Sequence, residues 1–312
     1  MLKKILVGIL LAAVVLLDIF LLRTVSVIAS NVIIVLFAVG ASFEMWRVNK
    51  ISVKSRSEFA QTEDGSAQIK SETVKLEKGD YKDFNLYVLL LSPIVNFVLF
   101  TFLGDVGIII TLLVAAVCML SYFTFAIRPL EELIANLSVL VYPQLFIGLF
   151  YAINSNLTYG LLADFLFLAI AIFTDNGAMF MGMLFKGKKL CPRISPKKTV
   201  SGAIGGLFWG TVGALLTFLL FSYLRLFESV NNAGAFLLAD AMWKEILIYA
   251  SIGILGAAAD QIGDLCASAV KRRVGIKDYG KLIPGHGGVM DRLDGMSFVL
   301  VVVYIAMRII FA

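Results

Sequence analysis

The chain has 312 residues, of which 60% are hydrophobic and 16% charged, and its mean hydropathy is +0.91. An ordinary soluble domain does not reach these values, so the composition excludes that class and indicates an integral membrane protein. The net charge of +5 comes from 27 basic and 22 acidic residues. The polar segment after residue 47 mixes both signs almost evenly, which argues against a nucleic-acid arm, so we expect no nucleic-acid partner.

Continuous apolar runs predict nine transmembrane helices, over residues 5–22, 25–46, 85–103, 106–127, 133–153, 157–181, 201–224, 245–265 and 295–311. Each run is about long enough to cross a hydrocarbon core of roughly 30 Å. The runs do not alternate between apolar and polar residues, so a membrane barrel is disfavoured. The first run lacks a clear signal-peptide cleavage site, which predicts a retained helix. The predicted fold class is all-α, a polytopic integral membrane protein with cytoplasmic active-site loops.

We expect four regions along the chain. These are N-terminal transmembrane helices at 1–48, a polar cytoplasmic linker at 49–84, a transmembrane scaffold at 85–156 and a catalytic transmembrane region at 157–312. The nine-helix arrangement places 23 of the 27 basic residues on one face of the membrane. An excess of Lys and Arg marks the cytoplasmic side, so we expect the basic loops to face the cytoplasm.

A first polar cluster, with the sequence FTDNGAMFMGMLFKGKKLCPRISPKKT, runs from the end of the predicted sixth helix towards the seventh. Asp175 and Asn176 lie near the end of that helix. An ionised group near the centre of a membrane helix costs about 2.5–3.5 kcal/mol, so such residues are usually functional or paired. A purely structural pair between Asp175 and a lysine of another helix is the alternative. Lys197 and Lys198 precede a predicted helix start, where free amides and the helix dipole favour an anion.

A second polar cluster, GDLCASAVKRRVGIKDYGKLIPGHGGVMDRLDGM, lies between the last two predicted helices and is expected to form a charged loop. Asp264 ends an apolar run, one turn after Asp260, while Asp291 and Asp294 share one face of the next helix start. Basic residues and glycines beside carboxylates favour a phosphate held by Lys and Arg, with a hard divalent metal between phosphate and carboxylate oxygens. The alternative is a basic loop that only sets membrane topology.

The run from Ser268 to Asp294, SAVKRRVGIKDYGKLIPGHGGVMDRLD, resembles the signature of the phosphatidate cytidylyltransferase family, also called CDP-diacylglycerol synthase. The shared positions are S-x-x-K-R, then K-D, then H-G-G-x-x-D-R-x-D. The segment from Asp175 to Ser201, which contains SPKKT, is also similar to the family. It departs from the family pattern at Asn176, Phe180, Val200 and Ser201, where Ser201 stands in place of a glutamate. The resemblance covers about Asp175 to Asp294.

The resemblance implies a role for each matching residue. Asp264 and Asp291 are expected to bind Mg²⁺ and, with Lys271 and Arg272, to form the catalytic set, and a second cation is left open. The expected substrate-binding residues are Asp175, Asn176, Ser195, Lys197, Lys198, Lys277, His286, Gly287, Gly288, Arg292 and Asp294.

The resemblance also implies a function. We expect a nucleotidyltransferase of phospholipid biosynthesis that converts CTP and phosphatidic acid to CDP-diacylglycerol and pyrophosphate. Its site would face the cytoplasm from a bacterial-type inner membrane, with CTP, phosphatidic acid and the lipid bilayer as partners, and a homodimer is left open. The alternatives are an ion-coupled transporter that uses intramembrane acids as a pathway, and a phosphotransferase acting on another lipid phosphate.

Overall fold

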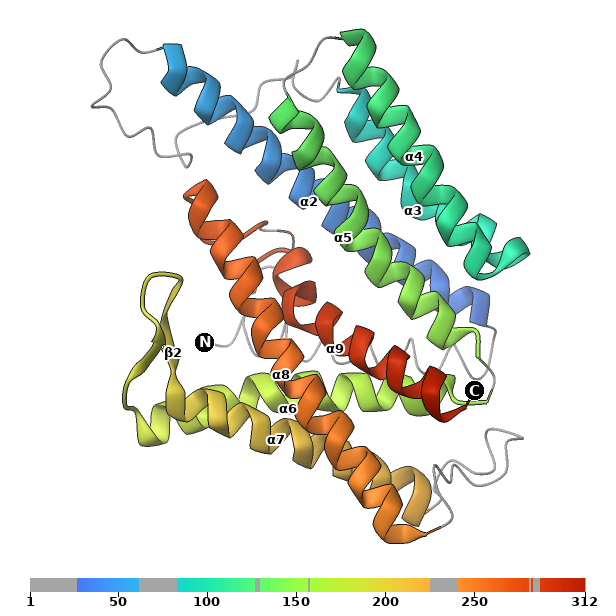
Figure 1. Ribbon diagram of the computed structural model, residues 1–312, viewed down its shortest axis with the longest axis vertical. Coiled ribbons are helices and arrows are strands. Elements are labelled where there is room, and N and C mark those ends of the chain that lie inside the picture. Colours follow the sequence, from blue (N-terminus) through green and yellow to red (C-terminus); the bar gives the residue numbers. More distant parts are fainter. Residues whose placement is uncertain are drawn as a thin grey trace. The chain divides into compact units, whose positions relative to one another are not determined.

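The computed structural model describes residues 27–61, 83–126, 130–156, 158–224, 241–280, 282 and 287–311. Its helices are α2 (Val27–Gln61), α3 (Phe84–Leu103), α4 (Asp105–Ala126), α5 (Leu130–Asn154), α6 (Gly160–Phe185), α7 (Val200–Phe218), α8 (Met242–Val274) and α9 (Met290–Ile310) (Figure 1). A π-helical turn, η2 (Leu219–Tyr223), continues α7. Two short strands, β1 (Lys189–Cys191) and β2 (Ser195–Thr199), form an antiparallel hairpin. The predicted all-α fold is confirmed.

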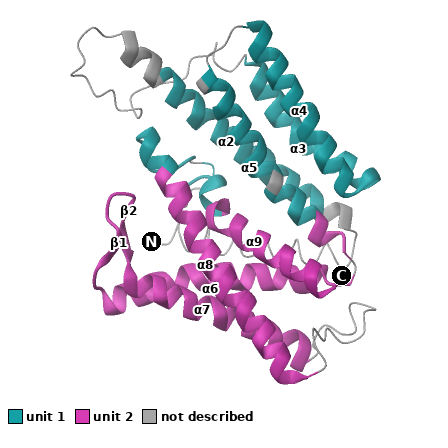
Figure 2. Cartoon of the chain, in the orientation of Figure 1, with its two compact units in different colours: residues 1–151, 270–292 teal, residues 152–269, 293–312 magenta. Residues whose placement is uncertain are grey.

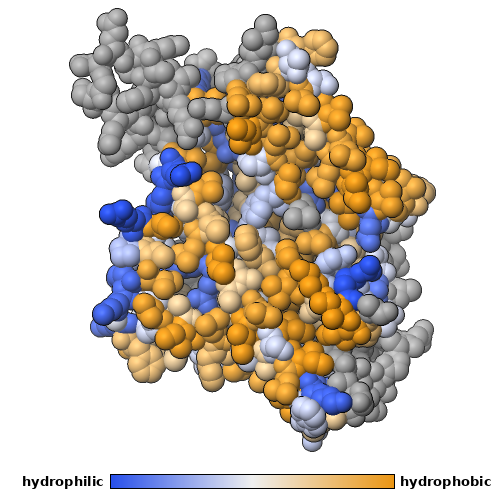
Figure 3. All heavy atoms as spheres, in the orientation of Figure 1, coloured by the Kyte–Doolittle hydropathy of each residue, from blue (hydrophilic) through white to orange (hydrophobic). Residues whose placement is uncertain are grey.

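Eight of the described helices are long and apolar enough to cross a membrane. The predicted helix at 5–22 lies outside the described residues. Large apolar side chains face outward on these helices: Phe102 is 80% exposed and Phe125 is 88% exposed. Hydrophobic residues cover most of the visible helical surface in Figure 3. A soluble protein does not expose apolar area on this scale, so the chain is a polytopic integral membrane protein.

Three helices extend well beyond their predicted apolar spans. The eighth span was predicted to end at 265, but α8 continues to Val274, so the prediction that Asp264 ends this helix and begins the charged loop is wrong. Lys271, Arg272 and Arg273 occupy the last turn of α8, where positive charge favours the carbonyl end of a helix. Similarly, α2 runs to Gln61 and α9 begins at Met290. Hydropathy locates the part of a helix inside the membrane and misses its polar ends.

The chain divides into two compact units (Figure 2). Unit 1 comprises Met1–Tyr151 and Val270–Arg292, and unit 2 comprises Ala152–Ala269 and Leu293–Ala312. The chain passes between the units near the end of α5, within α8 and within α9, so the last turn of α8 and the first turn of α9 belong to unit 1.

In unit 1, polar side chains connect the apolar helices. Lys50 of α2 donates to Asp83, the N-cap of α3, at 2.7 Å and to Glu132 of α5 at 2.9 Å. Deeper in the unit, Gln144 of α5 donates to Ser92 of α3 at 2.8 Å. Polar groups in an apolar helix need partners within the protein, so these contacts favour one arrangement of α2, α3 and α5.

In unit 2, glycines allow close helix crossings. A Cβ atom added to Gly177 of α6 would lie 2.3 Å from the Cβ of Trp209, and one added to Gly210 of α7 would lie 2.3 Å from Thr174 Oγ1. On α8, an added Cβ at Gly253 would lie 2.8 Å from the Cβ of Ala214. Small residues at these crossings let the backbones of α6, α7 and α8 approach closely, as is common in membrane helix bundles.

Candidate active site

The hairpin joins directly to the start of α7 in unit 2. Thr199 is the N-cap of α7, and its Oγ1 accepts a hydrogen bond from Gly202 N at 3.1 Å. Val200 N donates to the carbonyl of Lys188 at 3.0 Å, and Ser201 Oγ donates to the carbonyl of Lys186. Two amides at this helix start are therefore used within the protein. The expectation of free amides for an anion is wrong for these two positions, although Lys197 and Lys198 do lie immediately before the helix, as predicted.

Lys198 forms an ion pair with Asp264 of α8. The two side chains are 26% and 29% exposed, so the pair lies near the surface of unit 2. Ser268, one turn further along α8, donates to Asp264 Oδ1 at 3.4 Å. Ser195, also predicted to bind substrate, is half-buried in β2, and Lys197 is exposed there. The structure thus brings a predicted phosphate ligand into contact with a predicted metal ligand.

Asp260 lies one turn before Asp264 on α8 and is only 1% exposed. Both of its carboxyl oxygens are buried without a hydrogen-bond partner among the described residues. The charges of Asp175, Asp264, Asp294 and Lys198 lie close enough to act on it electrostatically. An added Cβ on Gly295 would lie 2.5 Å from Asp260 Oδ1, so a glycine of α9 provides the space for this carboxyl group. Asp260 is a buried acceptor whose hydrogen-bonding capacity is unused.

Three other predicted residues of unit 2 lie on α6 and α9. Asp294 is 8% exposed, and its Oδ1 accepts from Gly295 N at 2.9 Å. Asp175 and Asn176 are exposed on α6, where Asn176 Nδ2 donates to the carbonyl of Ile172 at 2.8 Å. Carboxylate oxygens are the ligands that Mg²⁺ prefers, and the unfilled acceptors of Asp260 fit a hard cation. In the part of the chain that the structure describes, no three His, Cys, Asp or Glu side chains form a ready-made metal site.

In unit 1, the carboxylate of Asp291 in the first turn of α9 collects several donors. Its Oδ1 accepts from Lys271 Nζ at 2.8 Å. Its Oδ2 accepts from Tyr279 N at 2.8 Å, Gly288 N at 2.9 Å and Gly280 N at 3.4 Å. A carboxylate offers about four acceptor positions, so these contacts use the capacity of Asp291. Asp291 therefore holds together α8, the chain that follows it and the start of α9.

The structure describes most of the other predicted site residues of unit 1. Gly287 has a φ of 87°, a backbone conformation that favours glycine, and His286 lies outside the described residues. Arg272, Lys277 and Arg292 are exposed, and Arg272 Nη1 donates to the carbonyl of Ile276 at 3.3 Å. These basic side chains lie on the surface around the residues that Asp291 binds.

Glu44 of α2 was not predicted to belong to the site. It is 1% exposed, and its Oε2 accepts from Met290 N at 3.0 Å. The family resemblance begins only at about Asp175, so it gave no role to residues of α2. The available signal was an acid inside the apolar run AVGASFEMW, because an ionisable residue within a membrane helix is seldom without a role.

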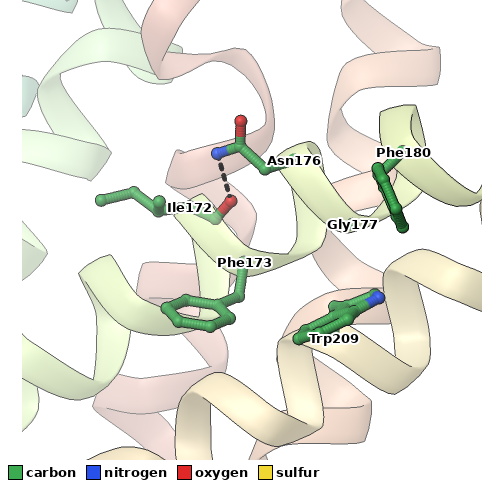
Figure 4. A pocket seen from close by; sticks show the side chains of 6 residues that line it. All are labelled: Ile172, Phe173, Asn176, Gly177, Phe180 and Trp209. Atoms are coloured by element: carbon green, nitrogen blue, oxygen red, sulfur yellow. Dashed lines mark hydrogen bonds between the residues drawn. The ribbon is translucent and has the colours of Figure 1, made fainter.

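An open apolar pocket of about 390 Å³ lies on unit 2, where α6 and α7 meet. It is lined by Ile172, Phe173, Asn176, Gly177, Phe180 and Trp209 (Figure 4). The close-up shows the indole of Trp209 on α7 below Gly177, with the ring of Phe180 near the same stretch of α6. Asn176 is the one predicted substrate residue that contributes to this pocket, which is otherwise suited to hydrocarbon.

The chain is thus a polytopic membrane protein in which two lysines, Lys198 and Lys271, form ion pairs with helix carboxylates. The model of the cytidylyltransferase family matches residues 2–310, so the chain belongs to that family.

Several relatives are named phosphatidate cytidylyltransferase. The relative from Brucella suis is 38% identical over 168 residues, which cover 51% of this chain and 54% of the relative. The relative from Thermotoga maritima is 36% identical over 171 residues, covering 55% and 57%. The relative from Staphylococcus saprophyticus is 38% identical over 136 residues, covering 44% and 45%. The chain spans about half the length of these relatives.

Proposed function

We propose that the chain is a CTP-dependent cytidylyltransferase that converts phosphatidic acid and CTP to CDP-diacylglycerol and pyrophosphate. The observation that carries this proposal is the family match over residues 2–310, together with relatives named phosphatidate cytidylyltransferase. The site geometry supports it, because the two carboxylates predicted to bind metal, Asp264 and Asp291, are each paired with a lysine predicted to act on phosphate.

In this reaction, an oxygen of the phosphate group of phosphatidic acid attacks the α-phosphorus of CTP. The new P–O bond forms as the bond from the α-phosphorus to the oxygen of the β-phosphate breaks, and pyrophosphate leaves with that electron pair. Such a transfer needs charge neutralisation and in-line positioning more than covalent help from the protein. Lys197, Lys198, Lys271, Arg272 and Lys277 are proposed to supply positive charge for the phosphates.

The proposed cofactor is Mg²⁺, with Asp264 and Asp291 as its proposed ligands and the unfilled acceptors of Asp260 as a further oxygen source. Asp291 would bind the cation once Lys271 leaves its Oδ1. When bound, the cation would neutralise phosphate charge and polarise the phosphoryl oxygens. Lys198 and Lys271 bring an ammonium group to these same two carboxylates. We propose that each lysine keeps its carboxylate oriented and turns to a phosphate oxygen when substrate enters. A second cation stays a prediction.

An amphiphilic substrate explains why this chemistry is placed in a membrane protein. The acyl chains stay in the lipid while the head group meets a water-soluble nucleotide, and the apolar pocket beside Asn176 is suited to hydrocarbon. We propose that the site faces the cytoplasm from a bacterial inner membrane, in line with the distribution of basic residues. A homodimer stays a prediction.

Product formation by the full chain tests the proposed function. The purified protein in detergent micelles is given radiolabelled CTP, Mg²⁺ and either phosphatidic acid or a polyprenyl phosphate. We expect label in CDP-diacylglycerol with phosphatidic acid only, with release of pyrophosphate. Label transferred only to the polyprenyl lipid would identify a different lipid transferase. An ion flux in proteoliposomes without nucleotide transfer would identify a transporter.

A further inference from the structure

Helix α2 contacts both ends of the segment 279–290 in unit 1. Glu44 and Arg47 lie three residues apart on α2, so they share one face of that helix. Arg47 Nη2 donates to the carbonyl of Tyr279 at 2.9 Å, at the start of the segment. Glu44 Oε2 accepts from Met290 N at 3.0 Å, at its end. One turn of α2 therefore holds together two points of the chain that are eleven residues apart.

The glycines of the segment fit closely around Glu44. An added Cβ on Gly280 would lie 1.9 Å from Glu44 Oε1, and one on Gly288 would lie 2.2 Å from Glu44 Oε2. Neither glycine has a positive φ, so the requirement for glycine at these positions comes from close approach to Glu44. The Glu44 side chain thus lies between the two ends of the segment and touches both.

Burial makes this contact specific. Glu44 is 1% exposed, and its Oε1 has no hydrogen-bond partner among the described residues. Tyr279, 3% exposed, is held from two directions, because its carbonyl accepts from Arg47 while its amide donates to Asp291 at 2.8 Å. A buried carboxylate is retained in a membrane helix only where its contacts compensate for its desolvation. The contact that compensates here is the hydrogen bond from Met290 N, and it ties Glu44 to the end of the segment.

We propose that Glu44, assisted by Arg47, is a positioning residue that fixes the ends of the segment 279–290 and so sets the geometry of the nucleotide site. The link to nucleotide rests on the proposed function: we take CTP as the substrate of Gly287 and Gly288, which are predicted to bind substrate, and Asp291 as a ligand of its cation. Glu44 acts through these residues and does not touch substrate itself.

The first experiment compares Glu44→Ala and Glu44→Gln with the wild type by hydrogen exchange on the purified full chain. In Glu44→Ala, we expect the amides of Met290 and Gly288 to exchange at least tenfold faster. In Glu44→Gln, one acceptor oxygen remains and the change should be smaller. Leu36→Ala, at an exposed position of the same helix, is the matched control and should leave these amides unchanged. Unchanged exchange of Met290 in Glu44→Ala would overturn the proposal.

A kinetic measurement separates positioning from general structural support. We expect Glu44→Ala to raise the KM for CTP about tenfold or more while the KM for phosphatidic acid stays within about twofold, and Glu44→Gln to recover much of the loss. Equal increases in both KM values, or a fall in kcat alone, would contradict positioning of the nucleotide site.

A double-mutant cycle tests the contact itself. Gly280→Ala places a methyl group where Glu44 lies, so it should abolish most activity or folding in the wild-type background and have little further effect in Glu44→Ala. Gly287→Ala is the control, because its cost arises from the positive φ and should add to that of Glu44→Ala. Additive effects of Gly280→Ala and Glu44→Ala would overturn the proposal. If the wild type forms no CDP-diacylglycerol, the proposed function fails. Hydrogen exchange at Met290 and the double-mutant cycle, scored by the fraction of folded protein, still test the Glu44 contact in that case.

Discussion

Asp260 in unit 2 and Asp291 in unit 1 are both carboxylates of membrane helices, but their surroundings are opposite. Asp291 accepts from one lysine and three backbone amides. Asp260 is almost fully buried, with no hydrogen-bond partner for either oxygen among the described residues and with three other acids near enough to act on it. One site is rich in donors and the other is rich in acceptors.

The difference indicates two kinds of role. A carboxylate with all of its acceptor positions filled stabilises the chain that supplies the donors, and removing it leaves those donors unpaired. A buried carboxylate without donors is unfavourable in the protein alone, so it indicates a ligand that supplies positive charge. We therefore expect substitutions in the two units to separate effects on rate from effects on stability.

The largest effect is expected from Asp264→Asn, which keeps the size of the side chain and removes the charge proposed to hold Mg²⁺. The turnover of CTP should fall roughly a thousandfold or more, because the barrier rises by several kcal/mol. Asp105→Asn, an exposed acid in the first turn of α4, is the matched control and should retain wild-type turnover. A folded Asp264→Asn variant with wild-type turnover and an unchanged Mg²⁺ dependence would contradict the metal assignment.

Asp291→Asn and Asp260→Asn test the contrast between the donor-rich surroundings of Asp291 and the acceptor-rich surroundings of Asp260. Removing one partner of the Lys271–Asp291 pair, whose side chains are 11% and 6% exposed, should lower the free energy of unfolding by about 3–5 kcal/mol. Asp260→Asn removes a buried acid without a donor and should leave that free energy unchanged or raise it. Both variants should lose turnover. Equal losses of stability, measured by thermal unfolding in detergent, would show that the two carboxylates do not differ as described.

A smaller effect is expected from the lysine that pairs with Asp264. Lys198→Ala should raise the KM for at least one substrate by roughly 10- to 100-fold, since a charge-assisted phosphate contact contributes about 1.5–3 kcal/mol. Lys197→Ala, at the exposed neighbouring position, should have a weaker effect. Steady-state kinetics with each substrate varied in turn provides the measurement. An unchanged KM for both substrates in the Lys197→Ala, Lys198→Ala double variant would rule out phosphate binding by these two lysines.

The smallest effect on activity is expected from single cysteines that report topology. In a background without the three native cysteines, probes at Lys188 in the hairpin and Lys277 after α8 should both react from the cytoplasmic side. Both positions are exposed. Lys188 has no proposed role in the reaction, so its substitution should leave turnover nearly unchanged, while the Lys277 variant is scored by labelling alone because Lys277 is proposed to bind phosphate. Reaction of the two probes from opposite sides would contradict the shared orientation of these segments.

The sequence predicts the helical class and the apolar part of each described helix, because hydrocarbon requires long continuous apolar runs. It does not predict where the helices end. Lys271 and Arg272 are as compatible with a last helical turn as with a loop, so Asp264 was expected at the end of α8 rather than within it. The hairpin at Lys189–Thr199 was missed for a similar reason, since its strands are too short and polar for a clear alternating pattern.

The sequence also points to Asp264, Asp291, Lys198 and Lys271 as chemically important, and the structure shows that they form two ion pairs. The pairing itself could not be predicted, because each pair joins residues that are distant in the chain. Glu44 shows the same limit: its contact with Met290 joins positions 246 residues apart, and no spacing rule relates them. That Asp264 and Asp291 bind Mg²⁺ stays a prediction.

The most direct test of the central proposal is CTP turnover by the wild-type chain in mixed micelles that contain phosphatidic acid. The account predicts Mg²⁺-dependent formation of CDP-diacylglycerol and pyrophosphate in equal amounts, lost on chelation of the metal and restored when Mg²⁺ is returned. A folded, monodisperse wild-type protein that forms neither product at saturating CTP, phosphatidic acid and Mg²⁺ would contradict it.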